Sequence, residues 1–357
     1  MPLDIDPAIL RALQTTLKID QSAATLSKHG GSGFAETLRI STPTTSIFVK
    51  TATSPGAAVM FEGEHASLNA IHDAVPSLCP KAYAWGKLDK RDGYFLATEF
   101  LDLGGRRLTT ASSGTSDGSG LSLAQKMAKL HSTPAPIPEG YDMPMFGFPV
   151  TTCCGDTPQD NSFRESWANF FAENRLLMIL QRSEKNNGKD AELRKVVERT
   201  ATEVVPRLLG EGHLGGKEGI KPVVVHGDLW SGNKGKGSFV GRDGAGPDQP
   251  GPVEEVVFDP SAVYAHNEYE IGIQMMFGGF GSAHFKEYHE LVPKTEPAEE
   301  YEVSEDAAGA ACADKEQDRV ALYESYHHLN HHSIFGGGYK SGAMNILKRL
   351  IKKYGNT

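Results

Sequence analysis

Two polar side chains, Asp228 and Asn233, lie in the segment HGDLWSGN at a spacing that suits phosphoryl transfer. That chemistry needs a phosphate anchor, oxygen ligands for Mg²⁺ and a carboxylate at the acceptor hydroxyl. The two residues are five positions apart, as in the catalytic loop H-R-D-L-x-x-x-N. We therefore predict that Asp228 is the catalytic base and that Asn233 is a Mg²⁺ ligand. The alternative is a plain turn in which Asn233 is a cap.

A second carboxylate, Asp259, ends the apolar run Val256-Val257-Phe258. Kinases place a Mg²⁺-binding aspartate of D-F-G at the end of such a strand. Here the residues after it are Pro and Ser, and no A-P-E segment follows, which argues against a protein kinase with a switchable activation loop. Asp259 is predicted to be the second Mg²⁺ ligand. The altered motif keeps open a scaffold without catalytic activity.

We predict that Lys50 and Glu64 together form the anchor for the ATP phosphates. Lys50 ends the run Ile47-Phe48-Val49, as the lysine of V-A-I-K does, and Glu64 falls on the next expected helix. The alternative is a surface lysine and a solvated glutamate. Upstream, Gly31 and Gly33 belong to a glycine-rich hairpin that would cover the phosphates, although the third glycine of G-x-G-x-x-G is missing.

The adenine is expected at the end of the last strand of the N-terminal half. There, backbone groups of Glu99, Phe100 and Leu101 would bind its edge, and residues 102–105 would form a hinge.

Hydrophobic periodicity predicts the elements that must position these groups. Strands are expected at 38–40, 46–50, 94–100 and 223–225, and helices at 7–19, 57–73, 121–132, 162–183 and 188–209. The Gly-, Pro- and Asp-rich segment 235–252 and the acidic segment 294–318 are predicted to be solvated loops, the first with a hairpin tip. The order predicts an α+β, bilobal, protein-kinase-like fold. Its β-rich N-lobe would be 1–105 and its mainly helical C-lobe 106–357, with the active site in the interlobe cleft.

Composition limits the partners. The formal net charge is −9, which argues against a nucleic-acid or anionic-membrane surface. The start of the chain lacks the features of a signal peptide, and no stretch of roughly 18 apolar residues occurs. The four cysteines include no C-x-x-C pair, so reduced thiols are expected. We expect a cytoplasmic protein with no nucleic-acid or membrane partner.

Two other motifs are weaker. The segment GGKE at 215–218 fails as a phosphate loop because position 218 is Glu where Ser or Thr is needed. Four histidines at 327, 328, 331 and 332 form i,i+4 pairs that could bind zinc, but a packed helix is the favoured interpretation.

Taken with HGDLWSGN, several further segments resemble the fructosamine/ketosamine-3-kinase family. They are FEGE at 61–64, FGF at 146–148, TCCG at 152–155, WANFFAENRL at 167–176, FDP at 258–260, EYE at 268–270, MFGGF at 276–280 and YHHLNHHSIFG at 326–336. The match covers nearly the whole chain. Aminoglycoside and choline kinases share the HGD-type loop and are the alternative.

The resemblance implies transfer of the ATP γ-phosphoryl group to the O3 hydroxyl of a ribulosamine or fructosamine on a protein lysine or a free amine. The product is unstable, so the amine is recovered. It implies Asp228 as base, Asn233 and Asp259 as Mg²⁺ ligands, Lys50 and Glu64 as the anchor, and Trp230 as a ring on which the sugar stacks. Trp230 as a packed core residue stays open. The family's cysteine in the glycine-rich loop is missing, so a monomer or weak homodimer is expected.

Overall fold

The computed structural model describes residues 4–31, 35–104, 120–242, 246–301 and 318–356. Contacts divide the chain into two compact units. The first unit comprises Met1–Lys126 and Asn233–Pro260, and the second comprises Met127–Gly232 and Ser261–Thr357. The lobe boundary expected at residues 105 and 106 falls where the described residues stop, so it stays a prediction.

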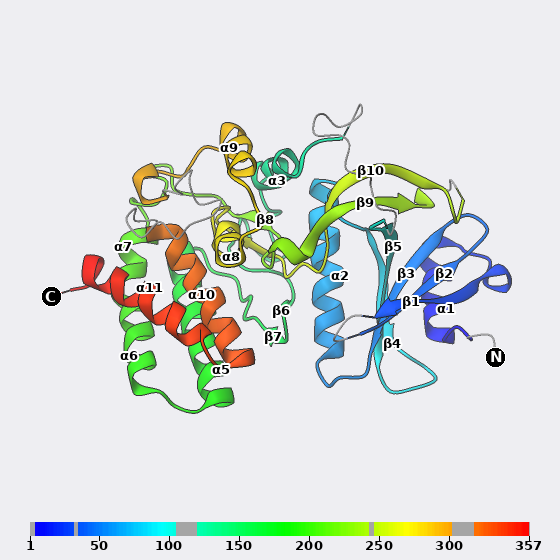
Figure 1. Ribbon diagram of the computed structural model, residues 1–357, viewed down its shortest axis with the longest axis horizontal. Coiled ribbons are helices and arrows are strands. Elements are labelled where there is room, and N and C mark those ends of the chain that lie inside the picture. The colour runs from blue at the N-terminus through cyan, green and yellow to red at the C-terminus, as the bar shows by residue number, and fades with distance from the viewer. Residues whose placement is uncertain (1–3, 32–34, 105–119, 243–245, 302–317, 357) are drawn as a thin grey trace. The chain divides into compact units, whose positions relative to one another are not determined.

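Within its described residues, the first unit is built on a seven-stranded antiparallel sheet (Figure 1). The strands run in the order β1-β2-β3-β5-β9-β10, and β4 pairs with β5. Their bounds are β1 Thr25–Gly31, β2 Glu36–Ser41, β3 Ser46–Ala52, β4 Ala82–Lys87, β5 Tyr94–Asp102, β9 Lys234–Val240 and β10 Pro250–Val257. The strands predicted at 38–40, 46–50 and 94–100 are therefore confirmed.

Two helices cover opposite faces of this sheet (Figure 1). Helix α1, Pro7–Leu17, starts at an aspartate cap, because the Asp6 carboxylate accepts the Ala8 backbone N–H at 2.9 Å. Its Leu13 shares a buried cluster with Val49 of β3. Side chains alternate along a strand, so Lys50 projects to the other face. That is the face on which α2, Ala57–Ala74, lies.

The segment 235–252 differs from the prediction of a solvated loop. Its ends are strands, because β9 pairs with β10 and also extends the sheet by pairing with β5, where Phe100 faces Val240. Gly237 permits the close approach, since a Cβ atom there would lie 2.7 Å from the Asp102 carbonyl oxygen. Long-range pairing thus overrides the loop-like composition. Only the connection between the two strands is a hairpin tip.

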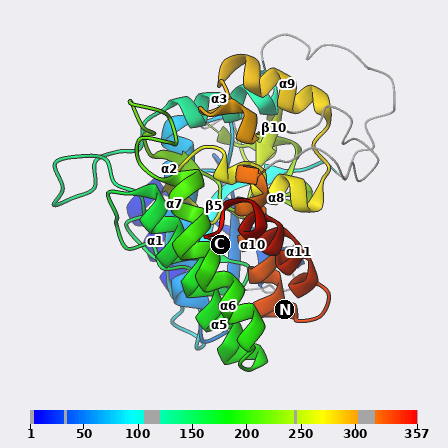
Figure 2. The same ribbon diagram turned by 90° about the vertical axis from the view of Figure 1, so that its left-hand side faces the viewer.

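The second unit is mainly helical (Figure 2). Its helices are α4 Trp167–Asn169, α5 Met178–Asn187, α6 Ala191–Arg199, α7 Val205–Leu209, α8 Tyr269–Phe277, α9 Ser282–Leu291, α10 Asp318–Phe335 and α11 Tyr339–Tyr354, and α3 Leu123–Ser132 leads into it. The π-helical turns Phe170–Leu177 and Thr200–Val204 join α4 to α5 and α6 to α7, so the helices expected at 162–183 and 188–209 are present. Short 3-10 turns occur at Gln21–Ala23, Ser231–Asn233 and Ala298–Tyr301.

A buried aromatic core holds these helices together. The Trp167 indole N–H donates to the Tyr323 hydroxyl at 2.9 Å, which links α4 to α10. His327, from the histidine run, is fully buried in α10, and its ring centre lies 5.7 Å from that of Tyr269. Burial lowers the pKa of the His327 imidazole well below its usual value, so the ring packs as a neutral group.

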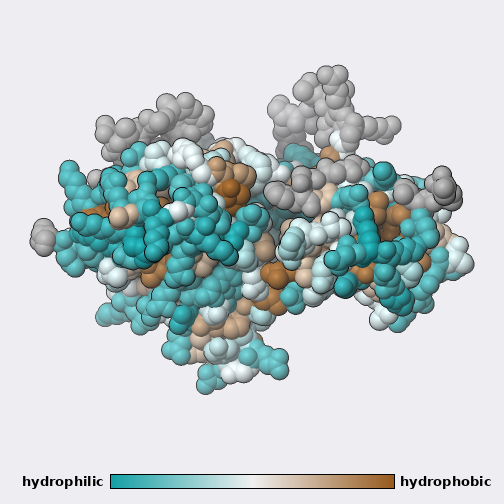
Figure 3. Space-filling view, turned by 90° about the horizontal axis from the view of Figure 1, so that it is seen from below, coloured by the Kyte–Doolittle hydropathy of each residue, from teal (hydrophilic) through white to brown (hydrophobic). Residues whose placement is uncertain are grey.

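The described helices include none that is both long and apolar enough to cross a membrane. The face shown in Figure 3 is mostly hydrophilic, with hydrophobic residues in small patches.

Candidate active site

The segment HGDLWSGN follows strand β8, Val223–Val225, which pairs with β11, Val263–Ala265. The Ser261 backbone N–H donates to the His226 carbonyl at 2.9 Å, so the start of the loop is tied to the residue that leads into β11. Gly227 has φ of 80°, and a Cβ atom there would lie 2.1 Å from the Ser261 carbonyl oxygen. Only glycine satisfies both conditions, which explains the Gly of the His-Gly-Asp motif.

A buried carboxylate that sequence reasoning missed holds the same loop. Glu270 of α8 is fully buried and accepts the His226 and Gly227 backbone N–H groups at 2.5 Å and 3.1 Å. Burial raises the pKa of Glu270, but contacts with His131 and His226 outweigh it, and the pKa lies below the usual value. Glu270 is therefore a charged acceptor that fixes the loop backbone. The available signal was a carboxylate inside the apolar stretch YEIGI.

Asp228, the predicted base, is half-buried. Its backbone N–H donates to Nδ1 of His226 at 3.3 Å, and the Cys154 thiol donates to its carboxylate with Sγ 3.7 Å from Oδ1. The base is thus oriented by groups from its own loop and from strand β6, Cys153–Cys154, which pairs with β7, Thr157–Pro158.

Trp230 is 38% exposed, which is unusual for a residue packed in a core. Its ring centre lies 5.6 Å from that of Phe277 in α8. The indole also covers Gly232, where an added Cβ atom would lie 2.2 Å from the ring. The indole is therefore accessible on the surface of the second unit, and it packs against Phe277 and Gly232.

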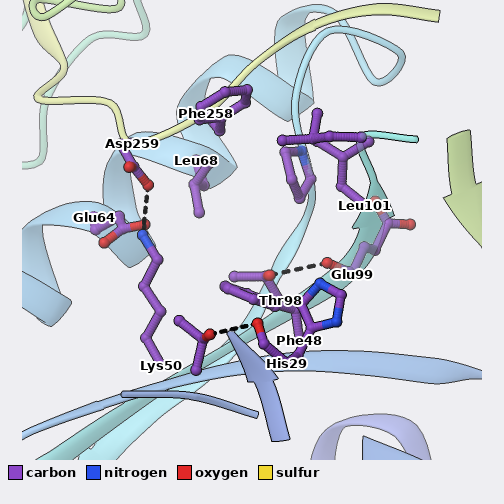
Figure 4. A pocket seen from close by; sticks show the side chains of 13 residues that line it. His29, Phe48, Lys50, Glu64, Leu68, Thr98, Glu99, Leu101, Phe258 and Asp259 are labelled. Atoms are coloured by element: carbon purple, nitrogen blue, oxygen red, sulfur yellow. Dashed lines mark hydrogen bonds and ion pairs between the residues drawn. The ribbon is translucent and has the colours of Figure 1, made fainter. Parts of the chain in front are cut away.

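The first unit contains a cavity of about 370 Å³ (Figure 4). Of the predicted nucleotide site, Lys50, Glu64, Glu99, Leu101 and Asp259 line it. Leu103 of the predicted hinge also lines it. Sequence reasoning missed other lining residues, namely His29, Thr37, Phe48, Leu68, Pro80 and Phe258. Most of these residues are apolar. A mainly apolar lining with a few polar groups is typical of small-molecule sites.

Lys50 connects two of the three acidic residues that line this cavity, Glu64 and Asp259 (Figure 4). Its ammonium lies 2.6 Å from the Glu64 carboxylate and 2.5 Å from that of Asp259. Burial alone would lower the pKa of Lys50, but the two carboxylates outweigh it and raise the pKa above its ordinary value. The lysine is therefore a permanent positive charge at one end of the cavity.

Backbone pairing places Asn233 beside Phe258, the residue before Asp259. Val257 faces Lys234 in the β9–β10 ladder, and the Phe258 N–H donates to the Asn233 carbonyl at 3.1 Å. Asn233 is 7% exposed, whereas the Asp259 side chain is 51% exposed. An amide oxygen and an accessible carboxylate are oxygen donors of the kind that Mg²⁺ prefers, so the two residue types fit this ion.

The strand predicted to bind adenine is present as β5, with its three residues in different settings. The Glu99 carboxylate is paired with Arg242 and accepts the Lys81 N–H at 2.9 Å. Leu101 lines the cavity, while the Phe100 ring packs 4.7 Å from that of His29.

The predicted glycine-rich hairpin is described only in part. Gly31 ends β1 and faces Glu36. Gly33 lies outside the described residues.

Comparison with known proteins identifies relatives over nearly the full chain. The family model for fructosamine kinase matches residues 5–353. A ketosamine-3-kinase from Mus musculus is 32% identical, with 95% of this chain and 100% of the relative covered. A chloroplastic protein-ribulosamine 3-kinase from Arabidopsis thaliana is 31% identical, with 86% and 76% covered.

Solved structures agree on the fold. A protein from Thermobifida fusca assigned as a fructosamine-3-kinase has a TM-score of 0.66 at 21% identity, with 98% of this chain and 100% of that chain covered. Another so assigned, from Haemophilus somnus, has a TM-score of 0.62 at 20% identity, with 96% of each chain covered. The predicted α+β, protein-kinase-like fold is confirmed, and so is the resemblance. The chain belongs to the fructosamine kinase family and is a phosphotransferase.

Proposed function

We propose that this protein transfers the γ-phosphoryl group of ATP to the O3 hydroxyl of a ketosamine, either a ribulosamine or a fructosamine. The phosphorylated adduct is unstable and releases the amine, so the reaction deglycates glycated lysines on proteins or free glycated amines. The observation that carries the proposal is the half-buried Asp228 with an exposed indole, Trp230, two residues away. The similarity to the mouse ketosamine-3-kinase supports the substrate class.

Several of the predicted residues have a defined role in this proposal. Asp228 accepts the proton of the O3 hydroxyl as the new P–O bond forms, and the bond to the leaving ADP oxygen breaks. Trp230 binds the C–H face of the sugar against its ring. The charge of Lys50, held by Glu64, binds the ATP phosphates, and the strand around Glu99 and Leu101 binds the adenine.

Asn233 and Asp259 are the residues that would hold Mg²⁺. Bound there, the ion would neutralise charge on the phosphates. The hydrogen bond from the Phe258 N–H to the Asn233 carbonyl, just beyond the β9–β10 ladder, supports this assignment because Asp259 directly follows Phe258.

We further propose a cytoplasmic monomer or weak homodimer that binds neither nucleic acid nor membrane. Cys79, Cys153 and Cys154 are free thiols, which fits a reducing compartment. The net charge of −9 disfavours polyanionic partners. Light scattering of the purified protein would measure the oligomeric state, and stable trimers or larger assemblies would contradict it.

The test of the proposed activity is a substrate panel with Mg²⁺ and ATP. ADP formation should depend on ribulosamine, erythrulosamine or fructosamine, and the product should carry phosphate on O3, which phosphorus NMR identifies. Aminoglycosides and choline form the comparison arm. ADP formation with those compounds and with none of the three ketosamines would contradict the proposal. The panel also ranks the three sugars.

The Gly232→Ala substitution tests the role of Trp230 without removing the ring. Because a Cβ atom would displace the indole, the KM for the ketosamine should rise about threefold to tenfold, the range expected for one lost ring contact. The KM for ATP should stay unchanged. The control is Gly281→Ala, since Gly281 has φ of −76° and open space around its Cα. Equal ketosamine KM values in both variants would refute the role of the indole.

A further inference from the structure

Cys154 lies behind the predicted base and contacts two other polar groups. Its side chain is almost completely buried, and its Sγ atom is 3.7 Å from Oδ1 of Asp228. Asn330, fully buried in α10, places its side-chain nitrogen 3.3 Å from the same Sγ and 3.2 Å from the Cys154 carbonyl oxygen. One sulfur atom therefore links the base to the helix that carries the histidine run.

The direction of these hydrogen bonds follows from their chemistry. A backbone carbonyl only accepts, so the Asn330 atom that faces it must be the amide nitrogen, which only donates. That nitrogen also donates to Sγ, so the sulfur is an acceptor on this side. The carboxylate of Asp228 only accepts as well, which leaves the S–H of Cys154 as the donor to it. The chain of donors runs from Asn330 through Cys154 to Asp228.

The thiol is kept in the protonated form that this arrangement needs. Burial, and then the neighbouring Asp228 charge, raise the pKa of Cys154 well above its usual value. A sulfhydryl is also a weak donor. A thiol that donates to a carboxylate orients it but lowers its basicity less than a hydroxyl or an amide would. This suits a carboxylate that must accept a proton.

We propose that Cys154 is a positioning residue for catalysis, whose thiol, oriented by Asn330, holds the Asp228 carboxylate in the direction of the acceptor hydroxyl. This inference rests on the proposed function, in which Asp228 is the base. Its neighbour Cys153 offers a matched control, since it lies in the same strand and is half-buried.

Kinetics as a function of pH provide the first test. In Cys154→Ala, kcat should fall about threefold to tenfold, as expected for one hydrogen bond from a weak donor. The KM for ATP should not change. Because the thiol stabilises the charged carboxylate, its loss should move the acidic limb of the kcat profile to higher pH. Cys153→Ala should match the parent enzyme. A Cys154→Ala profile that superimposes on that of the parent, or an equal effect of Cys153→Ala, would overturn the inference.

Infrared spectroscopy provides a second test that needs no activity. In a variant with Cys79, Cys153 and Cys312 replaced by alanine, the remaining S–H stretching band belongs to Cys154. Adding Asp228→Ala should shift that band to higher frequency, because the acceptor is lost. An unmoved band overturns the inference even if Cys154→Ala cannot be purified. If the parent enzyme has no ketosamine activity, the proposed function is refuted instead. The band shift would then still test whether the Cys154 thiol donates to Asp228.

Discussion

Replacing Asp228 with alanine is expected to lower ketosamine turnover by roughly 10²-fold or more, because the variant has no group to accept the O3 proton. The thermal unfolding midpoint should change little. Asp228 is half-buried, and the backbone of its loop is held by other residues. Single-turnover measurements with saturating ATP would isolate the chemical step from product release.

Two further variants sharpen this experiment. Asp228→Asn keeps the shape of the side chain and an acceptor oxygen for the Cys154 thiol but cannot act as a base, so it should lose nearly as much activity as alanine. Asp156→Ala is the matched control, since this carboxylate lies in the same unit, is 54% exposed and pairs with Arg182. Near-normal turnover of Asp228→Ala would remove Asp228 from the role of base.

The second large effect is expected for Glu270→Gln. The glutamine keeps one acceptor, but its NH₂ group replaces the other oxygen and faces a backbone N–H of residue 226 or 227. We expect a loss of roughly 2 to 3 kcal/mol in the free energy of unfolding, as for charged hydrogen bonds in a buried site. We also expect turnover of the folded protein to fall about tenfold or more, because a loop that moves by about 1 Å misplaces the base.

Glu268→Gln separates stability from positioning. Glu268 lies two residues away, is equally buried and pairs with Arg319 at 2.6 Å, so its loss should also destabilise the fold. Its carboxylate accepts from Arg319 and from the Thr295 backbone N–H, which lie outside the catalytic loop, so turnover per folded molecule should stay near that of the parent. Equal turnover losses in the two variants, corrected for the folded fraction, would contradict the specific role of Glu270.

The same residue predicts a pH dependence. The pKa of Glu270 lies below the ordinary value of 4.5, so the folded state binds this proton less readily than the unfolded state. Its contribution to stability is therefore complete above pH 4.5 and is lost as the pH falls through the lower pKa of the folded protein. The difference in unfolding free energy between parent and Glu270→Gln should shrink over this acidic range. A difference that is constant with pH would show that the charge of Glu270 does not matter.

Much of the candidate site could be predicted because its signals are local. The spacing of Asp228 and Asn233 is set within one short loop, and Lys50 follows directly from its strand. Chemistry that depends on neighbouring residues leaves a pattern that can be read along the chain. For the same reason, the helices 7–17 and 57–74 agree with their periodicity.

Other features depend on residues far apart in sequence. The Glu270 carboxylate is 44 positions from His226, and Asn330 is 176 positions from Cys154. The apolar residues around Glu270 suggest that it is buried, but nothing in the local sequence identifies the loop that its carboxylate holds. The segment 235–252 was wrongly predicted as a loop because its glycines suit an exposed coil equally well.

The amino-acid sequence by itself thus determined the family of this protein, and it predicted the chemistry: a carboxylate base, oxygen ligands for a metal ion and a lysine anchor. Only the tertiary structure decided how these groups are held. It joined β9 and β10 to the sheet, placed Lys50 between Glu64 and Asp259, and put Glu270 and Cys154 behind the catalytic loop. The physical reason is that residue type sets what a group can do, whereas burial and long-range hydrogen bonds set where it points.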